Sequence, residues 1–234
     1  MDYIIINGKK STLLNGLIIT SLPPITKPKI RANLEEIDGV DGDIINKLGY
    51  SAYDKSFEIG LSYNYNVDDV IEYFNTEGKI TFSNEPDKYY NFTMLNQIDF
   101  EKLLRFKKAK ITIHVQPFKY SNVESTKTYE FTGATQSLNV RNNGNIYSKP
   151  IITLYGNGTI NLSLNGIEVF TISLNGSMVL DTESQNAYDP ETLDFLNRYV
   201  IGDFKNLYLK IGLNTLSWTG DLTKVEINNC SRWI

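Results

Sequence analysis

The stretch Ala109–Gln116, AKITIHVQ, alternates apolar and polar residues along its whole length. A period of two places the apolar side chains on one face of a β-strand and the polar ones on the other. We therefore expect a half-buried strand here, with Ile111, Ile113 and Val115 facing a core. Ser56–Tyr65 shows the same alternation, and the apolar residues on one of its sides are Phe57, Ile59 and Leu61.

Turn residues divide the rest of the first half into short strands. Asn7-Gly8 follows the apolar run Tyr3–Ile6, and this dipeptide is a strong signal for a β-hairpin. Leu13–Ile19 repeats the pattern around a second Asn-Gly pair. The three prolines of Ser21–Pro28 indicate an extended arm or an edge segment. Residues 80–94 are interpreted as another hairpin, with its turn at 84–87.

One helix stands out in the first half. Asn66 is a favourable N-cap, acidic residues follow it in the first turn, and Gly78 lies just past the end. The apolar residues Val67, Val70, Ile71 and Phe74 recur at helical spacing, so this helix should pack on a sheet. Phe100–Phe106 is either a second short helix or a loop.

The second half has a different character. Ser121–Thr128 contains one apolar residue and is predicted to link two domains, residues 1–128 and 129–234. Short strands with glycine-containing turns follow, and hairpin turns are predicted at Leu164–Ile167 and Leu174–Gly176. Regularly spaced short strands of this kind are typical of a β-sandwich.

Two further elements are expected near the C-terminus. Asp189-Pro190-Glu191 should open a short helix, because it combines a cap, a first-turn proline and an acid. Two last strands are expected on either side of Thr219-Gly220-Asp221, and their apolar residues are Leu216 and Trp218, then Val225 and Ile227.

Composition excludes several classes of protein. The 234 residues include 41% hydrophobic residues, a net charge of -4 and one cysteine. A single cysteine excludes an internal disulfide framework and favours a reducing compartment. The N-terminus lacks the pattern of a signal peptide, and no apolar run reaches the ~20 residues of a membrane span. The mild acidity argues against general nucleic-acid binding.

Chemistry-bearing residues do not form a recognisable catalytic set. His114, the one histidine, falls on the polar face of the Ala109–Gln116 strand, where a solvent-facing role is expected. One histidine and one cysteine, Cys230, cannot supply an ordinary zinc site. No G-x-S-x-G, GxGxxG or Walker motif is present, and no pair of carboxylates is singled out for glycoside hydrolysis. We therefore predict a non-enzyme with no catalytic, cofactor-binding or metal-binding residues.

Three other features have a functional and a structural interpretation. The acidic loop Glu35–Asp43 could bind calcium, but its Asp-Gly pairs are also what tight turns use. The basic cluster Lys102–Lys110 could contact phosphate, although a solvated face is favoured. Trp218 could stack on a sugar, yet its register with Leu216 favours the core. The triplet Asn91-Phe92-Thr93 does not imply glycosylation without a secretion signal.

Two segments of the second half resemble recurrent signatures of the phage distal tail (Dit) protein family. One is residues 143–158, NGNIYSKPIITLYGNG. The other begins with YVIGDF at 199–204 and continues through Leu207 and GLNTL at 212–216 to Trp218. The first half matches the family in outline, from the Asn7-Gly8 hairpin to the strand that ends at Pro117-Phe118. The resemblance covers almost the whole chain in order.

The resemblance implies a mainly β protein with an N-terminal β-rich ring (belt) domain, which carries one short helix, and a C-terminal galectin-like β-sandwich. Such proteins form a homo-hexameric ring at the tail tip of long-tailed phages or prophage-derived particles. The implied partners are the tail tube protein, the tail-tip (tail-associated lysin) protein and receptor-binding proteins. DNA passes through the central channel without specific binding, and no membrane is involved. The implied location is the virion, after synthesis in the host cytoplasm.

A ring needs contacts between neighbouring copies, and Ser21–Pro28 is a plausible strap to a neighbour. A DNA channel should repel phosphate, so we expect some of the acids of the Glu35–Asp43 loop to face the channel or a subunit boundary. These acids are Glu35, Glu36, Asp38, Asp41 and Asp43. The alternative function is a carbohydrate-binding module for host cell-wall saccharide, which would need an exposed aromatic platform at Trp218 or Tyr155. A hydrolase would need a cleft with two carboxylates.

Overall fold

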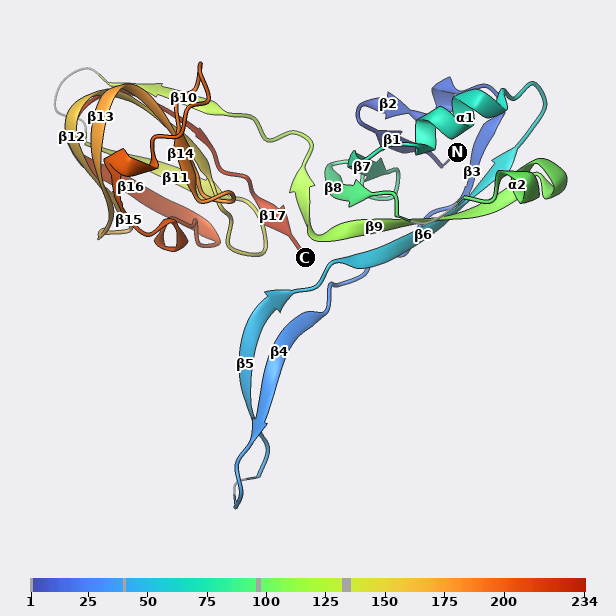
Figure 1. The fold of residues 1–234 in the computed structure, drawn as a ribbon, viewed down its shortest axis with the longest axis horizontal. Coiled ribbons are helices and arrows are strands. Elements are labelled where there is room, and N and C mark those ends of the chain that lie inside the picture. Colours follow the sequence, from blue (N-terminus) through green and yellow to red (C-terminus); the bar gives the residue numbers. More distant parts are fainter. Residues whose placement is uncertain (1, 40, 96–97, 132–135) are drawn as a thin grey trace. The chain divides into compact units, whose positions relative to one another are not determined.

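The computed structural model describes residues 2–39, 41–95, 98–131 and 136–234, and it divides the chain into two compact units. The first unit runs to Asn122 and the second begins at Val123. Strands make up 56% of the structure and helices 10% (Figure 1). The prediction of a mainly β protein is therefore confirmed.

The first unit is built on one antiparallel sheet with the strand order β2-β1-β7-β8-β9-β6-β3. Its apolar face carries one core, which includes Phe57, Phe82 and Ile111. The strands are β1 (Ile4–Ile6), β2 (Lys9–Lys10), β3 (Leu17–Ser21), β6 (Tyr53–Leu61), β7 (Gly78–Phe82), β8 (Lys88–Thr93) and β9 (Lys108–Ser121).

The two alternating stretches form neighbouring strands of this sheet. β9 contains the predicted strand, and its Ile111, Ile113 and Val115 are fully buried. β6 pairs with β9 so that Phe57 lies opposite Ile111 and Ile59 opposite Ala109. The side-chain period of two is thus the signal that fixes which face of each strand meets the core.

Asn-Gly pairs behave differently at two places in the first unit. At Asn7-Gly8 both residues have positive φ, 47° and 84°, and β1 pairs with β2 as predicted. The second predicted hairpin, at Leu13–Ile19, is wrong. Residues Ser11–Leu13 form a 3-10 turn (η1), and β3 pairs with β6 because its apolar residues continue the core of the larger sheet.

Two helices accompany this sheet. α1 (Val67–Phe74) starts where Asn66 accepts a hydrogen bond from the Asp68 amide at 3.0 Å, and its Val70, Tyr73 and Phe74 side chains are buried. α2 (Phe100–Phe106) shows that the helical alternative was correct for this segment. Leu103 anchors α2 in the core and is fully buried.

A separate two-stranded hairpin interrupts the first unit. It consists of β4 (Ile30–Glu36) and β5 (Asp43–Tyr50), which pair with each other as a separate two-stranded sheet (Figure 1). For this region, only the turns at the tip of the hairpin were predicted from the sequence. After Ser21, the last residue of β3, the proline segment leads into the hairpin without regular structure, and Pro23 and Pro28 are buried. The long extended element of this region is therefore the hairpin rather than the proline segment.

The second unit is one seven-stranded antiparallel sheet with the order β10-β16-β12-β13-β14, in which β11 also pairs with β16 and β15 with β13. Its strands are β10 (Lys127–Glu130), β11 (Ser137–Asn142), β12 (Ile151–Leu164), β13 (Ile167–Asp181), β14 (Asn186–Tyr188), β15 (Val200–Gly202) and β16 (Gly212–Asn228). The same residue range contains two 3-10 turns, η2 (Asn197–Tyr199) and η3 (Phe204–Asn206), and the short strand β17 (Arg232–Trp233), which is not part of this sheet. β10 places Lys127 and Thr128 in this unit, so we keep a division at 128/129 only as a proposal.

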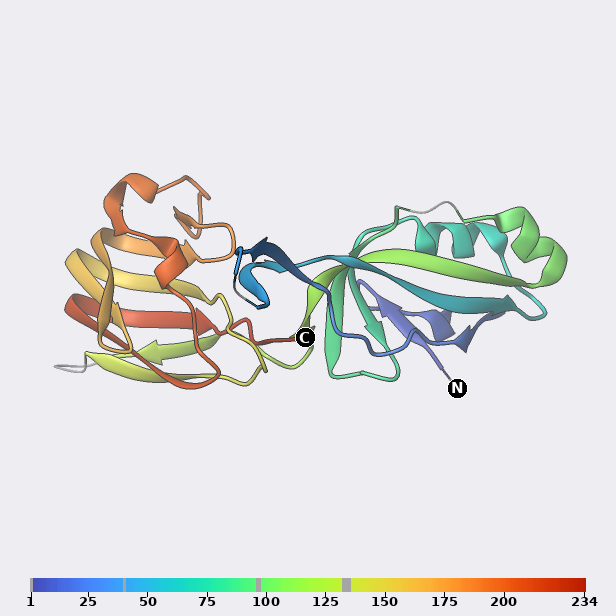
Figure 2. The same ribbon diagram turned by 90° about the horizontal axis from the view of Figure 1, so that it is seen from below.

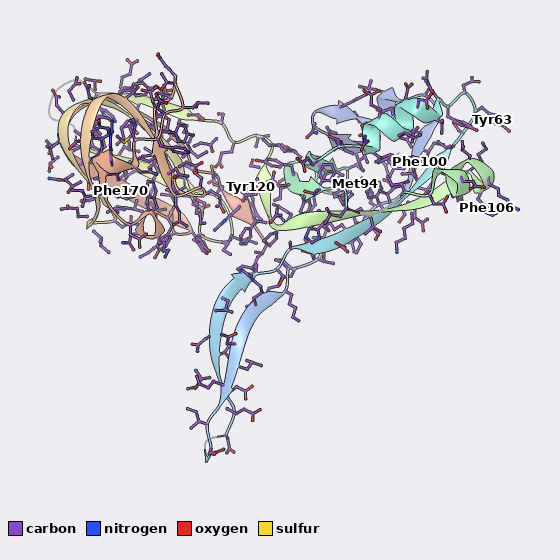
Figure 3. The ribbon with its side chains drawn as sticks, in the orientation of Figure 1. Tyr63, Met94, Phe100, Phe106, Tyr120 and Phe170 are labelled. Carbon is purple, nitrogen blue, oxygen red and sulfur yellow. The ribbon has the colours of Figure 1, made fainter. Side chains whose placement is uncertain are left out.

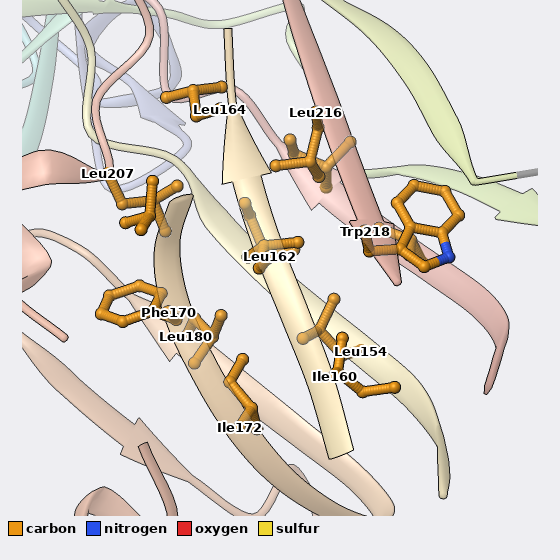
Figure 4. Packing of buried hydrophobic residues seen from close by; sticks show 14 of the residues in the cluster. Leu154, Ile160, Leu162, Leu164, Phe170, Ile172, Leu180, Leu207, Leu216 and Trp218 are labelled. Atoms are coloured by element: carbon orange, nitrogen blue, oxygen red, sulfur yellow. The ribbon is translucent and has the colours of Figure 1, made fainter. Parts of the chain in front are cut away.

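The three long strands bend at one place, and the bend makes the sheet curl around a single core (Figure 2). Gly156 of β12 lies opposite Gly176 of β13, and Asn157 lies opposite Asp221 of β16, next to Gly220. Leu154 and Ile160, on either side of the bend in β12, are both fully buried (Figure 4).

For the second unit the structure confirms one prediction and corrects three, two of them because of the bend. Leu164–Ile167 is a hairpin turn as expected, with φ of 52° at Asn165 and 80° at Gly166. Leu174–Gly176 is instead the bend inside β13, and the two last strands around Gly220 are one bent strand, β16. Asp189 caps a single turn through the amides of Glu191 and Thr192, and no helix follows because the chain pairs again at Phe195.

Candidate functional site

The candidate catalytic residues His114 and Cys230 belong to different units, and each makes ordinary contacts within its own unit. His114 Nδ1 lies 2.8 Å from Asp54 Oδ1, its cross-strand neighbour, and both side chains are partly or largely exposed. The predicted polar-face position of His114 is thus confirmed. Burial raises the pKa of the Cys230 thiol to about 11, which keeps it in the protonated, weakly nucleophilic form at neutral pH.

The acidic loop has the geometry of turns. Gly39 and Gly42 have φ of 81° and 91°, values that favour glycine. Within the described ranges, no group of three or more His, Cys, Asp or Glu side chains is arranged to hold a metal ion. The two φ values agree with the turn interpretation of the Asp-Gly pairs. No helix of the described residues is long and apolar enough to cross a membrane.

A buried ionic cluster lies at the root of the β4–β5 hairpin. Glu85 accepts a hydrogen bond from Lys119 Nζ at 2.8 Å and one from the Tyr90 hydroxyl at 3.1 Å. Lys55 Nζ donates to the Pro24 carbonyl oxygen at 2.7 Å, and burial lowers its pKa to about 8. The cluster therefore fixes the proline segment from which the hairpin starts.

Sequence reasoning missed this cluster, although a signal was present. Lys55 precedes Phe57 by two residues in β6, and Lys119 follows Val115 by four in β9. Both lysines therefore fall on the same face as the buried apolar residues of their strands. Extending the period-two pattern by one or two steps would have placed them at the edge of the core.

The β4–β5 hairpin exposes an unusual amount of apolar surface for an isolated ribbon (Figure 3). An isolated two-stranded hairpin is at best marginally stable in water, and exposed apolar patches mark interaction sites. Its exposed aliphatic side chains, with the exposed fraction of each, are Leu34 (64%), Ile37 (45%), Ile44 (47%), Ile45 (59%) and Leu48 (58%). The hairpin is the strongest candidate for a surface that another protein chain covers.

The basic cluster Lys102–Lys110 covers α2 and the start of β9. Arg105, Lys107, Lys108 and Lys110 are exposed, which agrees with the predicted solvated face, while the side chain of Lys102 lies outside the described residues. The exposed aromatic side chain of Phe106 lies within the same segment.

Trp218 does not form a sugar platform. It is 3% exposed and packs against Phe131 with ring centroids 4.8 Å apart, so its predicted core role is confirmed (Figure 4). Tyr155 is half-buried, and Lys224 Nζ covers its ring at 3.7 Å from the centroid. The two aromatic residues named for saccharide binding therefore do not offer a free face together.

A different aromatic site occurs in the second unit. A cavity of about 450 Å³ is lined by Tyr147, Tyr208 and Phe204, together with Lys149 and Lys205. The rings of Tyr147 and Tyr208 meet edge to face with centroids 5.8 Å apart, and each is about 40% exposed. Concave sites with aromatic walls and a few polar groups are typical of ligand binding.

Comparisons with known proteins bear on the fold. No protein-family model and no curated protein sequence matches the chain. The solved structure of the SPP1 Dit protein (gp 19.1), a hub of the adsorption apparatus in phages that infect Gram-positive bacteria, matches with a TM-score of 0.68 at 17% identity, over 97% of this chain and 98% of that one. A chain of the phage p2 baseplate in its activated conformation with Sr matches with a TM-score of 0.52 at 11% identity, over 97% and 96%. Along nearly its whole length, the chain has the fold of a phage distal tail (Dit) hub protein.

Proposed function

We propose that the chain is a structural hub protein of the tail tip of a long-tailed phage or a prophage-derived particle. The observation that carries the proposal is the match to the SPP1 Dit protein, which extends over both units in order. In this role the chain forms a hexameric ring between the tail tube protein and the tail-tip (tail-associated lysin) protein, with a central channel for DNA. Receptor-binding proteins attach to the same assembly, and the protein resides in the virion after synthesis in the host cytoplasm.

The residues agree with a role in assembly rather than chemistry. The β4–β5 hairpin offers exposed aliphatic side chains, and among the described residues no further strand pairs with its two outer edges. Free edges and apolar patches are what a neighbouring chain can cover. We keep the N-terminal unit as the ring (belt) domain and the C-terminal unit as the outward-facing, galectin-like sandwich.

The test is the mass of the purified chain in solution, measured by light scattering over a range of concentrations. The expected result is a species near six times 26.6 kDa that shows a central opening in negative-stain images. If the chain stays monomeric alone, addition of the tail tube protein and the tail-tip protein of the same genome should assemble it. A chain that stays monomeric with both partners present contradicts the proposal.

A second candidate function is binding of host cell-wall saccharide by the second unit. The cavity lined by Tyr147, Tyr208 and the two lysines favours it, because aromatic faces stack on sugar rings and lysines pair with anionic groups. Binding of purified wall polysaccharide should weaken in Tyr208→Ala and persist in Tyr63→Ala, an exposed tyrosine of the other unit. Equal binding by both variants excludes this cavity as the site.

A further inference from the structure

We propose that the β4–β5 hairpin of one copy of the chain docks on the surface around α2 of a second copy. This inference rests on the proposed self-assembly and names the two surfaces that would make it. The receiving surface, here called the α2 surface, consists of Tyr63, Leu104, Arg105, Phe106, Lys107 and Lys108, all exposed side chains.

The hairpin has apolar side chains on both of its faces. Leu34 lies opposite Ile45, so these two side chains share one face. Ile44 lies opposite Glu35 on the other face, and Leu48 lies beyond a register shift near the root. A ribbon that packs on its own sheet would need only one apolar face. Apolar residues on both faces indicate that a neighbouring chain encloses the hairpin.

The tip of the hairpin is strongly acidic. Five exposed carboxylates, called the tip acids, lie within nine residues, and no cation lies between them. They are Glu35, Glu36, Asp38, Asp41 and Asp43. Mutual repulsion opposes this arrangement in the free chain, so a cationic partner surface would be favoured.

The α2 surface has the complementary chemistry. Arg105, Lys107 and Lys108 bring three positive charges to the end of α2 and the start of β9. Phe106 is 63% exposed and Tyr63 is 93% exposed, and Figure 3 shows both at the α2 end of the first unit. Exposed aromatic side chains and arginine are the residues most enriched where proteins bind one another. The surface thus matches an acidic, aliphatic ribbon in both charge and polarity.

Local contacts hold this surface together. Lys107 Nζ donates to the Tyr65 hydroxyl at 2.6 Å and lies 4.3 Å from the centre of that ring. The Leu61 amide donates to the Lys107 carbonyl oxygen at 3.0 Å, and the Arg105 guanidinium lies over the Phe106 ring. The loop after β6 and the end of α2 therefore form one presented surface before any partner arrives, which lowers the entropic cost of docking.

The two surfaces lie at opposite ends of β6. The hairpin ends at Tyr50, three residues before the start of β6 at Tyr53, whereas Lys108 pairs with Gly60 near its other end. A strand of this length spans about 30 Å. Donor and acceptor surfaces at opposite ends of one unit give a head-to-tail contact, and such heterologous contacts close into rings when the rotation permits.

Charge reversal on each surface tests the contact in the full-length chain. One variant carries Glu36→Lys and Asp38→Lys in the tip, and the other carries Arg105→Glu and Lys108→Glu in the α2 surface. Each alone should weaken self-association, measured by analytical ultracentrifugation, by about tenfold or more, because like charges then face each other. Mixing the two purified variants should restore association, since every contact in an alternating assembly again joins opposite charges.

Two controls accompany the charge reversals. A variant with Glu72→Lys and Glu191→Lys changes net charge as much as the tip variant at exposed positions elsewhere, and it should associate like the unchanged chain. Recovery on mixing excludes misfolding as the reason for loss. If the unchanged chain associates and both reversals leave it unaffected, this contact is wrong while the hub proposal stands. If the unchanged chain is monomeric at every concentration and with its tail partners, both proposals fail.

Discussion

At the scale of single residues, the cluster of Lys55, Glu85 and Lys119 shows how charge is accommodated beside an apolar core. Both lysines are nearly inaccessible to solvent, but only Lys119 makes an ion pair with Glu85. Lys55 bonds instead to a neutral carbonyl oxygen, that of Pro24. Removal of a charged ammonium from water disfavours the protonated form, which is the main cause of the lowered pKa of Lys55.

This shift predicts a specific pH dependence of stability. The unfolded chain keeps the Lys55 proton up to about pH 10.5, whereas the folded chain releases it near pH 8. Between these values the unfolded state binds more protons, so the contribution of Lys55 to the free energy of unfolding rises with pH. Burial also raises the pKa of Tyr73 and Tyr90, which opposes this trend above about pH 10.

The measurement is urea unfolding of the unchanged chain and of Lys55→Met at several values between about pH 7.5 and pH 9.5. The difference in the free energy of unfolding should move in favour of the unchanged chain as pH rises. Groups common to both proteins, including the Cys230 thiol of the second unit, cancel in this difference. A difference that is constant across the range would show that Lys55 keeps its ordinary pKa in the folded protein.

The second residue-scale prediction concerns Trp218. Because its side chain is buried against Phe131, Trp218→Ala should lower the free energy of unfolding of the second unit by about 3 to 5 kcal/mol. Phe195→Ala, at a 70% exposed position of the same unit, serves as control and should change it by less than about 0.5 kcal/mol. Equal effects of the two substitutions in denaturant melts would contradict the core role.

At the scale of elements, the bend of the second sheet depends on glycines at matched positions of neighbouring strands. A Cβ atom on Gly220, where φ is 98°, would meet the Thr159 carbonyl oxygen at 2.3 Å. Gly176 also has positive φ, 83°, but a Cβ atom there would meet nothing within 4 Å. A side chain at either position would strain the backbone, but only a side chain at Gly220 would also collide with a neighbouring strand. Comparing substitutions at the two positions therefore distinguishes the two effects.

This contrast gives the third prediction. Gly176→Ala should cost about 1 to 2 kcal/mol, the penalty for a left-handed conformation. Gly220→Ala carries a similar penalty, and in addition β12 and β16 must move apart at the bend, so its cost should be larger by about 1 to 3 kcal/mol. Urea unfolding of both variants measures the difference. If Gly220→Ala is no worse than Gly176→Ala, close approach at Gly220 is not what sets the bend.

The same elements show how far the sequence predicts the fold. Asn165-Gly166 and Asn175-Gly176 are the same dipeptide after a leucine, and one is a hairpin turn while the other bends a continuous strand. The distinction depends on Gly156 of β12, which lies opposite Gly176 and is distant from it in sequence. Strand faces were predictable because they follow a local period of two. The bend, the partners of β3 and the long hairpin were not, because they depend on contacts between distant segments.

The candidate functional residues, like the strands, were predictable only where a local sequence pattern determines their position. The position of His114 on the polar face of its strand followed from the period of two, and its contact with Asp54 agrees with it. The tip acids were noticed, but their place at the end of an exposed ribbon was not, because the apolar residues of β4 and β5 do not alternate as those of a half-buried strand do. Exposed aliphatic residues carry no sequence signature that separates an interface from a core.

At the scale of the whole molecule, the hairpin should contribute to assembly and little to the stability of its own unit. Its side chains at residues 33–39 and 41–46 are exposed, so few apolar contacts are lost when they are removed. Replacing residues 33–46 by Asn-Gly keeps the cross-strand pair Ala32 and Lys47 and joins it by a short hairpin turn. We expect this shortened chain to lose self-association and to keep the unfolding temperature of the unassociated chain.

Light scattering and thermal melts at low concentration, where the unchanged chain is also dissociated, measure the two effects separately. Stability gained through association depends on concentration, and so only the unassociated chains can be compared directly. A shortened chain that melts at a much lower temperature would mean that the hairpin supports its own sheet. If the shortened chain still associates, the contact between copies must involve other residues, because the tip acids and the aliphatic residues Leu34, Ile44 and Ile45 are then absent. Loss of association with an unchanged melting temperature identifies the ribbon as an element that is completed by a neighbouring chain.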